Sequence, residues 1–309
     1  DAVLDALGPA GRRPLDVLAS CDHDLADDAC RTACKTIRLR ADPLDRLVAE
    51  SLRCLAGTHA ALADYRQAEA LYRRAIGLHR ARMLGFEPGE LNSLPPAVYR
   101  MARLGFLEIT RAECDLGKLL LLRGHLDKAR THLERAHELR RHIQGIRPVE
   151  FSHTLHGLGL LWTALGDYRR AVQILEQALA WRREALGAGH IKTAESEAGL
   201  GRALMLAGKN TRARKLLATA LDTRIRLLEP GHRLVAQSRA LLADLNYNEH
   251  RYVEAAAGFR NALEGLDREG SGLRSIVGVR LSLADTLVQL CRLEEARTLG
   301  VSPERYKVV

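Results

Sequence analysis

The sequence predicts an all-α protein built as a right-handed solenoid of stacked antiparallel helix hairpins. Leu and Ala dominate the composition and only 4% of residues are aromatic, which suits helices that pack closely through small side chains. One alanine returns with a 42-residue period, at Ala129, Ala171, Ala213 and Ala255. Other residue types keep fixed distances from this recurring alanine, so the period belongs to a whole structural unit.

Two features of the expected first helix keep their distance from each of these alanines. A Leu followed by a small residue lies 13 and 12 positions upstream, at Leu116-Gly117, Leu158-Gly159, Leu200-Gly201 and Leu242-Ala243. A turn residue lies five positions upstream, at Gly124, Gly166, Gly208 and His250. We expect the small residue where the two helices of a hairpin meet. Glycine is expected in the turn because it tolerates left-handed dihedrals.

The expected second helix carries a matching apolar face. A large apolar residue follows each recurring alanine by four positions, at Leu133, Leu175, Leu217 and Phe259. Another alanine follows by seven positions, at Ala136, Ala178, Ala220 and Ala262. Positions four and seven apart share one face of a helix. A single hairpin cannot bury this face, so the stacked array is the predicted folding unit.

These residues resemble the tetratricopeptide repeat. The most complete match comprises Leu158-Gly159, Trp162, Gly166-Asp167-Tyr168, Ala171, Leu175 and Ala178. The basic unit of that family has about 34 residues, and the longer unit here is similar to that of kinesin light chains and of many bacterial signalling proteins. The linkers that end in His190 and His232 match this longer type. We expect each histidine to hydrogen-bond the start of the next helix.

The period divides the chain into three parts. Weaker units around Ala68 and Ala296 extend the predicted solenoid to residues 49–300, with about five to six units. Residues 1–48 are interpreted as an N-terminal helical cap and residues 301–309 as a C-terminal tail. The spacing from Ala68 to Ala129 exceeds the period by 19 positions, which predicts an insertion near 85–105.

The insertion begins with a stretch rich in proline and glycine, from Phe86 to Pro96, which we predict to be a loop. The pattern after Pro96 is helical and runs to about Arg123, which predicts a first helix extended at its N-terminal end. Insertions in repeat proteins map to loops on one face and often carry function. A functional loop and a neutral insertion both fit the sequence.

Charge and composition favour a cytoplasmic protein without a membrane span. No segment approaches 18 consecutive apolar residues, no signal peptide is visible, and the six cysteines are sparse. The formal charge is +9, but basic residues are interleaved with acidic ones and aromatic platforms are scarce, which argues against nucleic-acid binding. The start at Asp1 and the incomplete last unit favour a fragment or a processed chain.

The motifs of common enzymes are missing, so no catalytic role, cofactor or metal is predicted. No phosphate-binding glycine loop, nucleophile elbow or zinc-protease helix is present. A first set of candidate ligands matches no compact zinc motif and is expected to belong to the cap: Cys21, His23, Cys30 and Cys34. A second set is expected to form a solvated face: His125, His132, His137 and His142.

The resemblance implies that a partner lies in a concave groove lined by the first helix of each hairpin. Carried over position by position, the partner-binding residues are Lys118, His156, Leu160, Arg202, Met205, Asp244, Tyr247, Asn248 and Asp285. Their charges run from basic to acidic. Kinesin light chains hold cargo with asparagine pairs, and these are replaced here by pairs such as His156-Gly157, so cargo binding of that kind is not implied.

Two functions of different classes fit these observations. The first is a protein–protein interaction scaffold or adaptor that binds a peptide or protein segment in the groove. The second is the sensor or regulatory array of a larger signalling enzyme, such as a kinase, a caspase-like protease or a signalling ATPase. Nucleic-acid binding is a third, weaker reading. The sequence names neither the partner nor the oligomeric state.

Overall fold

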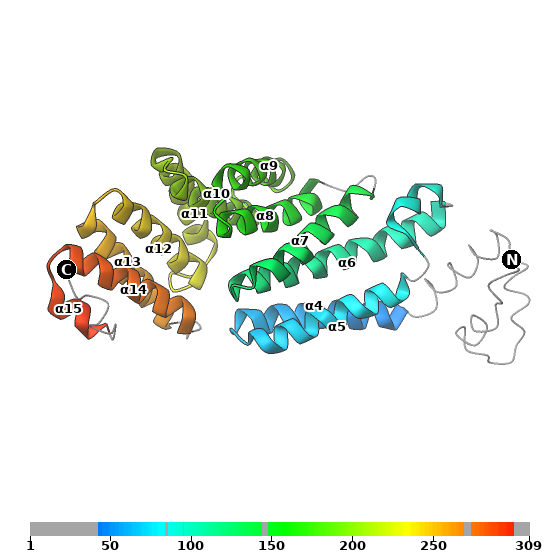
Figure 1. Cartoon of the computed structure of the whole chain (residues 1–309), viewed down its shortest axis with the longest axis horizontal. Coiled ribbons are helices and arrows are strands. Elements are labelled where there is room, and N and C mark those ends of the chain that lie inside the picture. Colours follow the sequence, from blue (N-terminus) through cyan, green and yellow to red (C-terminus); the bar gives the residue numbers. More distant parts are fainter. Residues whose placement is uncertain (1–42, 84–85, 95, 144–147, 269–272, 300–309) are drawn as a thin grey trace, which may run out of the picture. The chain divides into compact units, whose positions relative to one another are not determined.

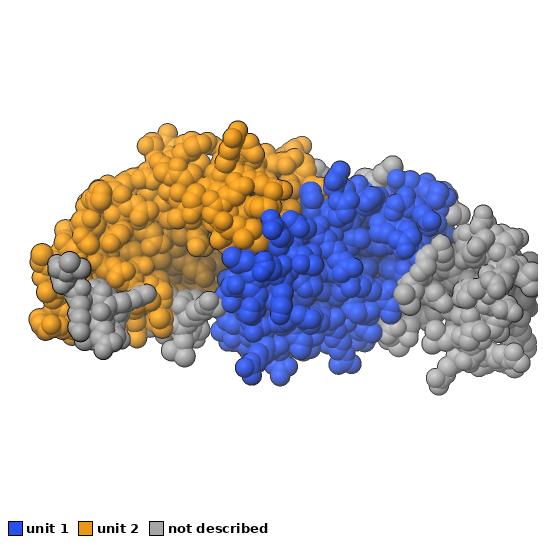
Figure 2. All heavy atoms as spheres, in the orientation of Figure 1, with its two compact units in different colours: residues 1–146 blue, residues 147–309 orange. Residues whose placement is uncertain are grey.

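The computed structural model describes residues 43–83, 86–94, 96–143, 148–268 and 273–299. Every regular element among these residues is a helix, and consecutive helices pack in pairs, so the prediction of an all-α repeat solenoid is confirmed. The chain divides into two compact units, residues 1–146 and 147–309 (Figure 2). The predicted cap, its four Cys and His residues, and the C-terminal tail lie almost wholly outside the described residues.

The described residues of unit 1 form two helix hairpins, and those of unit 2 form four (Figure 1). The elements of unit 1 are α4 (Pro43–Ala61), α5 (Tyr65–Arg82), the 3-10 helix η1 (Pro88–Ser93), α6 (Pro96–Leu122) and α7 (Leu126–Arg141). The elements of unit 2 are α8 (Pro148–Ala164), α9 (Tyr168–Leu186), α10 (Ile191–Leu206), α11 (Asn210–Leu227), α12 (Arg233–Asn248), α13 (Tyr252–Arg268), α14 (Leu273–Gln289) and α15 (Leu293–Thr298).

The recurring alanines lie where the sequence predicts, inside helix contacts. Ala129, Ala171, Ala213 and Ala255 are fully buried. The glycines of the Leu-Gly pairs face the large apolar residue of the second helix. A Cβ added at Gly159 would lie 2.3 Å from Leu175 Cγ, and the equivalent contacts at the neighbouring units are almost as close. Only glycine therefore permits this approach without displacing the leucine.

The turn inside each described hairpin uses one left-handed residue, five positions before the recurring alanine. Glycine occupies it at Gly124, Gly166 and Gly208. The same conformation is adopted by three residues that carry a Cβ, namely Ala63 (φ 61°), His250 (φ 60°) and Cys291 (φ 56°). The turn geometry is therefore maintained even where the residue type is unfavourable for it.

Side chains at the helix starts confirm the predicted caps. His190 Nδ1 accepts a hydrogen bond of 3.0 Å from the Lys192 amide, and His232 Nδ1 accepts one of 3.1 Å from the Leu234 amide. Both histidines therefore satisfy a backbone donor of the first helical turn, as predicted. Asp167 caps α9 in the same way, since its carboxylate accepts from the Arg170 amide at 3.0 Å.

The insertion in unit 1 differs in part from its prediction. The long helix α6 is confirmed, with 27 residues from Pro96 to Leu122. The segment predicted as a loop contains η1 instead, and Leu91 of η1 is fully buried. Leu91 joins Phe86, Val98 and Phe106 in a separate apolar cluster, so this segment is held in place by burial of its own side chains.

The four histidines of the second hairpin do not share one solvated face as predicted. His125 and His142 are exposed. His132 Nδ1 lies 2.6 Å from Oε2 of Glu113, a fully buried carboxylate that also pairs with Arg80. Burial raises the pKa of Glu113, but the hydrogen bond and charge of His132 together with Arg80 outweigh it, and the pKa stays below its usual value. His132 is therefore part of a polar network that connects α5, α6 and α7.

Candidate partner-binding surface

The first helices of the hairpins in unit 2 follow one another in space. Helix α10 contacts both α8 and α12, and α12 contacts α14. Residues at equivalent positions of these four helices therefore contribute to one continuous surface of unit 2. The position directly after each Leu–small pair places Leu160, Arg202, Asp244 and Asp285 on successive helices.

Seven of the nine predicted partner-binding residues have access to solvent. Arg202 and Asn248 are exposed, and Leu160, Asp244, Tyr247 and Asp285 are half-buried. Lys118 is half-buried on α6 of unit 1 and so belongs to the other unit. Eight of the nine predicted residues thus lie on the first helices of unit 2, and six of these eight have access to solvent.

His156 and Met205 lie inside the packing, contrary to the expectation that they face the groove. Only 2% of His156 and 7% of Met205 is exposed. His156 on α8 packs against α10, because a Cβ added at Gly199 would lie 3.0 Å from its Cε1 atom. The repeat register placed these positions on the first helices correctly, but it could not show that a neighbouring helix covers them.

The acidic part of this surface has an unusual carboxyl group. Burial raises the pKa of Asp244 to about 6, against the opposing effect of the Arg202 charge. Asp244 is therefore partly protonated just below neutral pH. Burial, followed by the negative charge of Asp285, also raises the pKa of Tyr247, which remains a neutral phenol. Its ring contacts that of Tyr252 edge to face, with centroids 5.4 Å apart.

A polar cluster fixes the turn between α12 and α13 at the end of this surface. Arg214 donates to Asn246 Oδ1 at 2.9 Å and to Glu249 Oε2 at 2.6 Å. Arg251 donates to the same oxygen of Asn246, also at 2.9 Å. The neighbouring Asn248 is exposed and is the amide of this turn that faces solvent. The cluster therefore fixes the position of the backbone next to Tyr247 and Asn248.

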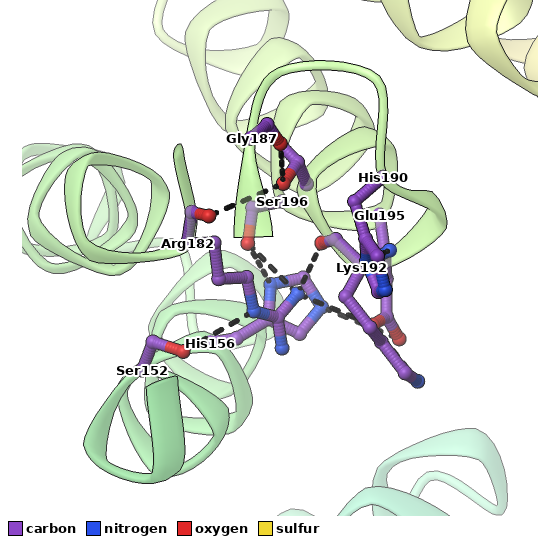
Figure 3. A network of polar contacts seen from close by, with 9 residues as sticks. Ser152, His156, Arg182, Gly187, His190, Lys192, Glu195 and Ser196 are labelled. Atoms are coloured by element: carbon purple, nitrogen blue, oxygen red, sulfur yellow. Dashed lines mark hydrogen bonds and ion pairs between the residues drawn. The ribbon is translucent and has the colours of Figure 1, made fainter. Parts of the chain in front are cut away.

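A buried arginine connects three helices beneath this surface (Figure 3). Arg182 of α9 is 1% exposed, and its Nη1 donates to the Lys192 carbonyl at 2.7 Å and to Ser196 Oγ at 2.9 Å, both on α10. It also lies 3.2 Å from Glu195 Oε2. Nε points towards Ser152 of α8 at 3.4 Å. Charge-assisted hydrogen bonds of this kind lock the relative positions of α8, α9 and α10.

This arginine repeats, although sequence reasoning did not single it out. Buried arginines recur with the period of the repeat, at Arg140, Arg182 and Arg224. Arg224 donates to the Leu234 carbonyl at 2.9 Å and to Ser238 Oγ at 2.7 Å, which copies the contacts of Arg182 one unit further along. The spacing was visible in the sequence. It was missed because arginine is rarely buried and was counted with the surface charges.

The described residues offer no ready site for a metal and no membrane span. Among them, no group of three or more His, Cys, Asp or Glu side chains is arranged to hold a metal ion. None of the helices in the described part of the chain is long and apolar enough to cross a bilayer.

Two segments of the chain match models of the tetratricopeptide repeat, residues 48–87 and residues 150–222. The first covers α4 and α5, and the second covers α8 to α10 and most of α11. A comparison with curated proteins finds no match. The helical hairpins and these matches show that the chain contains tetratricopeptide repeats. The recurring alanines are buried at the 42-residue spacing that the sequence predicts.

Several solved structures share this fold. BtubC (BKLC) from P. vanneervenii is 17% identical, with a TM-score of 0.56 over 76% of this chain and 87% of that one. A Rap protein complexed with Competence and Sporulation Factor is 15% identical, with a TM-score of 0.57 over 81% of this chain and 74% of that one. Aspartyl phosphate phosphatase F from Bacillus subtilis is 11% identical, with a TM-score of 0.57 over 96% of this chain and 69% of that one.

Proposed function

We propose that this protein is an interaction scaffold whose unit 2 binds an extended segment of a partner protein along α8, α10, α12 and α14. The observation that carries the proposal is the continuous surface on which Arg202, Asp244 and Asp285 occupy equivalent positions of successive helices. Tetratricopeptide repeats are interaction modules, and a structural neighbour of this fold was solved in complex with another factor.

The charges suggest how the segment would be oriented. Arg202 favours an acidic residue of the partner, and Asp285 favours a basic residue further along. Leu160 and Tyr247 offer apolar contact between polar groups, and the exposed Asn248 offers an amide to a peptide backbone. Lys118 would contribute only if the bound segment also reaches unit 1. His156 and Met205 would support the surface from beneath.

The proposal assigns no catalytic role, no cofactor and a cytoplasmic setting. Nucleic acid is not a proposed partner, because acidic side chains share this surface with Arg202. The same surface would serve a free scaffold or the regulatory array of a larger signalling enzyme, and no feature of the described residues favours the second.

Selection from a displayed library of random peptides tests this proposal. Full-length protein is immobilised, and enriched sequences are synthesised and measured by calorimetry. We expect an acidic residue and a basic residue at a constant separation in the enriched peptides. Binding should weaken by roughly tenfold or more in Arg202→Glu with Asp285→Lys, because both charge pairs become repulsive. Added salt should reduce this difference.

The matched control reverses two exposed charges on second helices of the same unit, Arg169→Glu on α9 and Glu264→Lys on α13. This variant should bind like the parent protein and has the same net charge as the test variant. Peptides that bind both variants equally would mean that the partner uses another face of the protein.

A further inference from the structure

Unit 1 contains a pocket beside the insertion. It has a volume of about 80 Å³ and lies between α4, α5 and α6. Its apolar wall consists of Met83, Met101, Leu104 and Gly105. Its polar wall consists of Arg46, His79, Arg82 and Glu108.

The insertion creates this pocket. Helix α8 begins at Pro148, and the position of α6 at the same distance from its own recurring alanine is Phe106. Residues 96–105 are therefore an extension that the regular repeats lack. Met101, Leu104 and Gly105 all belong to it. The extension is anchored by the apolar cluster around Leu91, so the wall that it forms is a packed part of unit 1.

Three polar atoms of the pocket residues are buried without a hydrogen-bond partner: Nε2 of His79, Oε2 of Glu108, and Nε of Arg82, a residue that interacts with other groups. His79 is 1% exposed, and its Nε2 atom has no partner. Glu108 is 6% exposed, and its Oε2 atom has none, while Oε1 accepts from Arg111 at 2.5 Å. Such groups carry a desolvation penalty unless a water or a ligand satisfies them. His79 and Glu108 line the same, mostly apolar cavity, so a polar group bound there lies close to both residues.

Nε2 of His79 and Oε2 of Glu108 require hydrogen-bond partners of opposite kinds. Burial, reinforced by nearby arginines, lowers the pKa of His79 to about 4, so the ring is neutral near pH 7 and Nε2 can carry the proton and donate. A carboxylate oxygen can only accept. A hydroxyl group accepts one hydrogen bond and donates another, so it suits both atoms. An anion would face Glu108, and a cation would face Arg46 and Arg82, which leaves a neutral group as the best match.

We propose that this pocket binds a small neutral alcohol, with the hydroxyl at His79 and Glu108 and the hydrocarbon part against Met83, Met101 and Leu104. The size agrees, because a dry cavity of about 150 Å³ holds benzene and half that volume suits roughly three to five heavy atoms. This site is separate from the partner-binding surface proposed for unit 2, so either proposal can fail without the other.

The methionines make a direct experiment possible. The sequence has three, of which Met83 and Met101 line the pocket and Met205 lies in unit 2. The full chain is labelled with ¹³C at the methionine methyl groups and titrated with propan-2-ol. We expect saturable chemical-shift changes at Met83 and Met101, and none at Met205. Acetone has the same number of heavy atoms but no proton to donate, and should bind about tenfold more weakly.

Two variants separate binding from non-specific solvent effects. Leu104→Trp fills the pocket from a half-exposed position and should abolish the shifts while the protein stays folded. Glu108→Gln should bring the affinities for propan-2-ol and acetone within about threefold of each other. Acetate serves as the anionic probe. The proposal is overturned if acetate binds more tightly than propan-2-ol, if all three methionines shift in parallel, or if no probe saturates, which would leave water as the only occupant.

Discussion

The position eleven residues after the recurring alanine is filled differently in the first hairpin of unit 1 and in the first two hairpins of unit 2. In the first two hairpins of unit 2 the residue there is Arg182 or Arg224, and each donates to a serine hydroxyl of the next hairpin. In unit 1 this position in the first hairpin is His79, and the residue equivalent to the serine is Ala112. The arginine position and the position of its serine acceptor therefore both differ in the first hairpin of unit 1.

This difference shows that a regular period allows an arginine to be buried. A buried guanidinium is tolerated only when fixed acceptors surround it, and a constant 42-residue step places the start of the next helix at the same point each time. The insertion replaces that helix start by the middle of α6. A neutral histidine avoids burying a charge there, and the space that remains is part of the pocket.

The largest expected effect is the loss of stability when a recurring alanine, buried between helices, is replaced by a large charged residue. Ala171→Arg should lower the free energy of unfolding by about 4 kcal/mol or more, through overpacking and burial of a charge. Ala180→Arg, at an exposed position on the same helix, is the matched control and should change it by less than about 0.5 kcal/mol. Urea denaturation followed by circular dichroism measures both. An unchanged midpoint for Ala171→Arg would refute the repeat register.

A second, smaller effect is expected from the buried arginine itself. Arg182→Ala should destabilise the protein by about 2–4 kcal/mol, because Ser196 and the Lys192 carbonyl lose a charged donor and the side chain leaves a void. His79→Ala at the equivalent position of unit 1 should cost about half as much. Arg169→Ala, which changes an exposed arginine of α9, serves as the control. Equal costs for Arg182 and His79 would remove the distinction between the units.

Acidification should affect the two units in opposite directions. The folded pKa of His79 is about 4, below its usual 6.5, so its contribution to stability is complete above pH 6.5 and is lost as the pH falls through 4. The folded pKa of Asp244 is about 6, above its usual 3.8, so its contribution is complete below pH 3.8 and is lost as the pH rises through 6. Each effect amounts to about 3 kcal/mol.

Stability curves between pH 4 and pH 7 for His79→Gln and Asp244→Asn check this contrast. Relative to the parent, His79→Gln should lose less stability on acidification, and Asp244→Asn should lose more. Parallel curves for all three proteins would show that neither group titrates abnormally in the folded state.

The smallest expected effect concerns the turns. Ala63→Gly should stabilise unit 1 by about 0.5–1 kcal/mol, because alanine is strained at its φ of 61°. Gly166→Ala in unit 2 should destabilise the protein by about 1 kcal/mol for the same reason, with φ at 84° and no neighbour within 4 Å of the new Cβ. Thermal melting resolves both changes. Similar signs for the two variants would show that packing, not the dihedral angle, controls these turns.

The 42-residue period was sufficient to predict the fold because it repeats contacts between residues that are close in sequence. The recurring alanines, the glycines of the Leu-Gly pairs and the capping histidines His190 and His232 each act through neighbours at a fixed sequence distance. Helix periodicity and turn chemistry depend on such short distances, so the sequence alone determined hairpins, their register and their stacking. The 27-residue helix α6 was predicted for the same reason.

Only the tertiary structure decided what each polar residue does. His156 and Met205 were expected to face the groove, yet adjacent packing covers them. His132 was expected in solvent, but it bonds a carboxylate buried on another helix. The sequence cannot show such contacts, because the burial of a side chain depends on which elements cross it. The period states which positions are equivalent, and three-dimensional packing decides which of them are covered, paired or left open to a ligand.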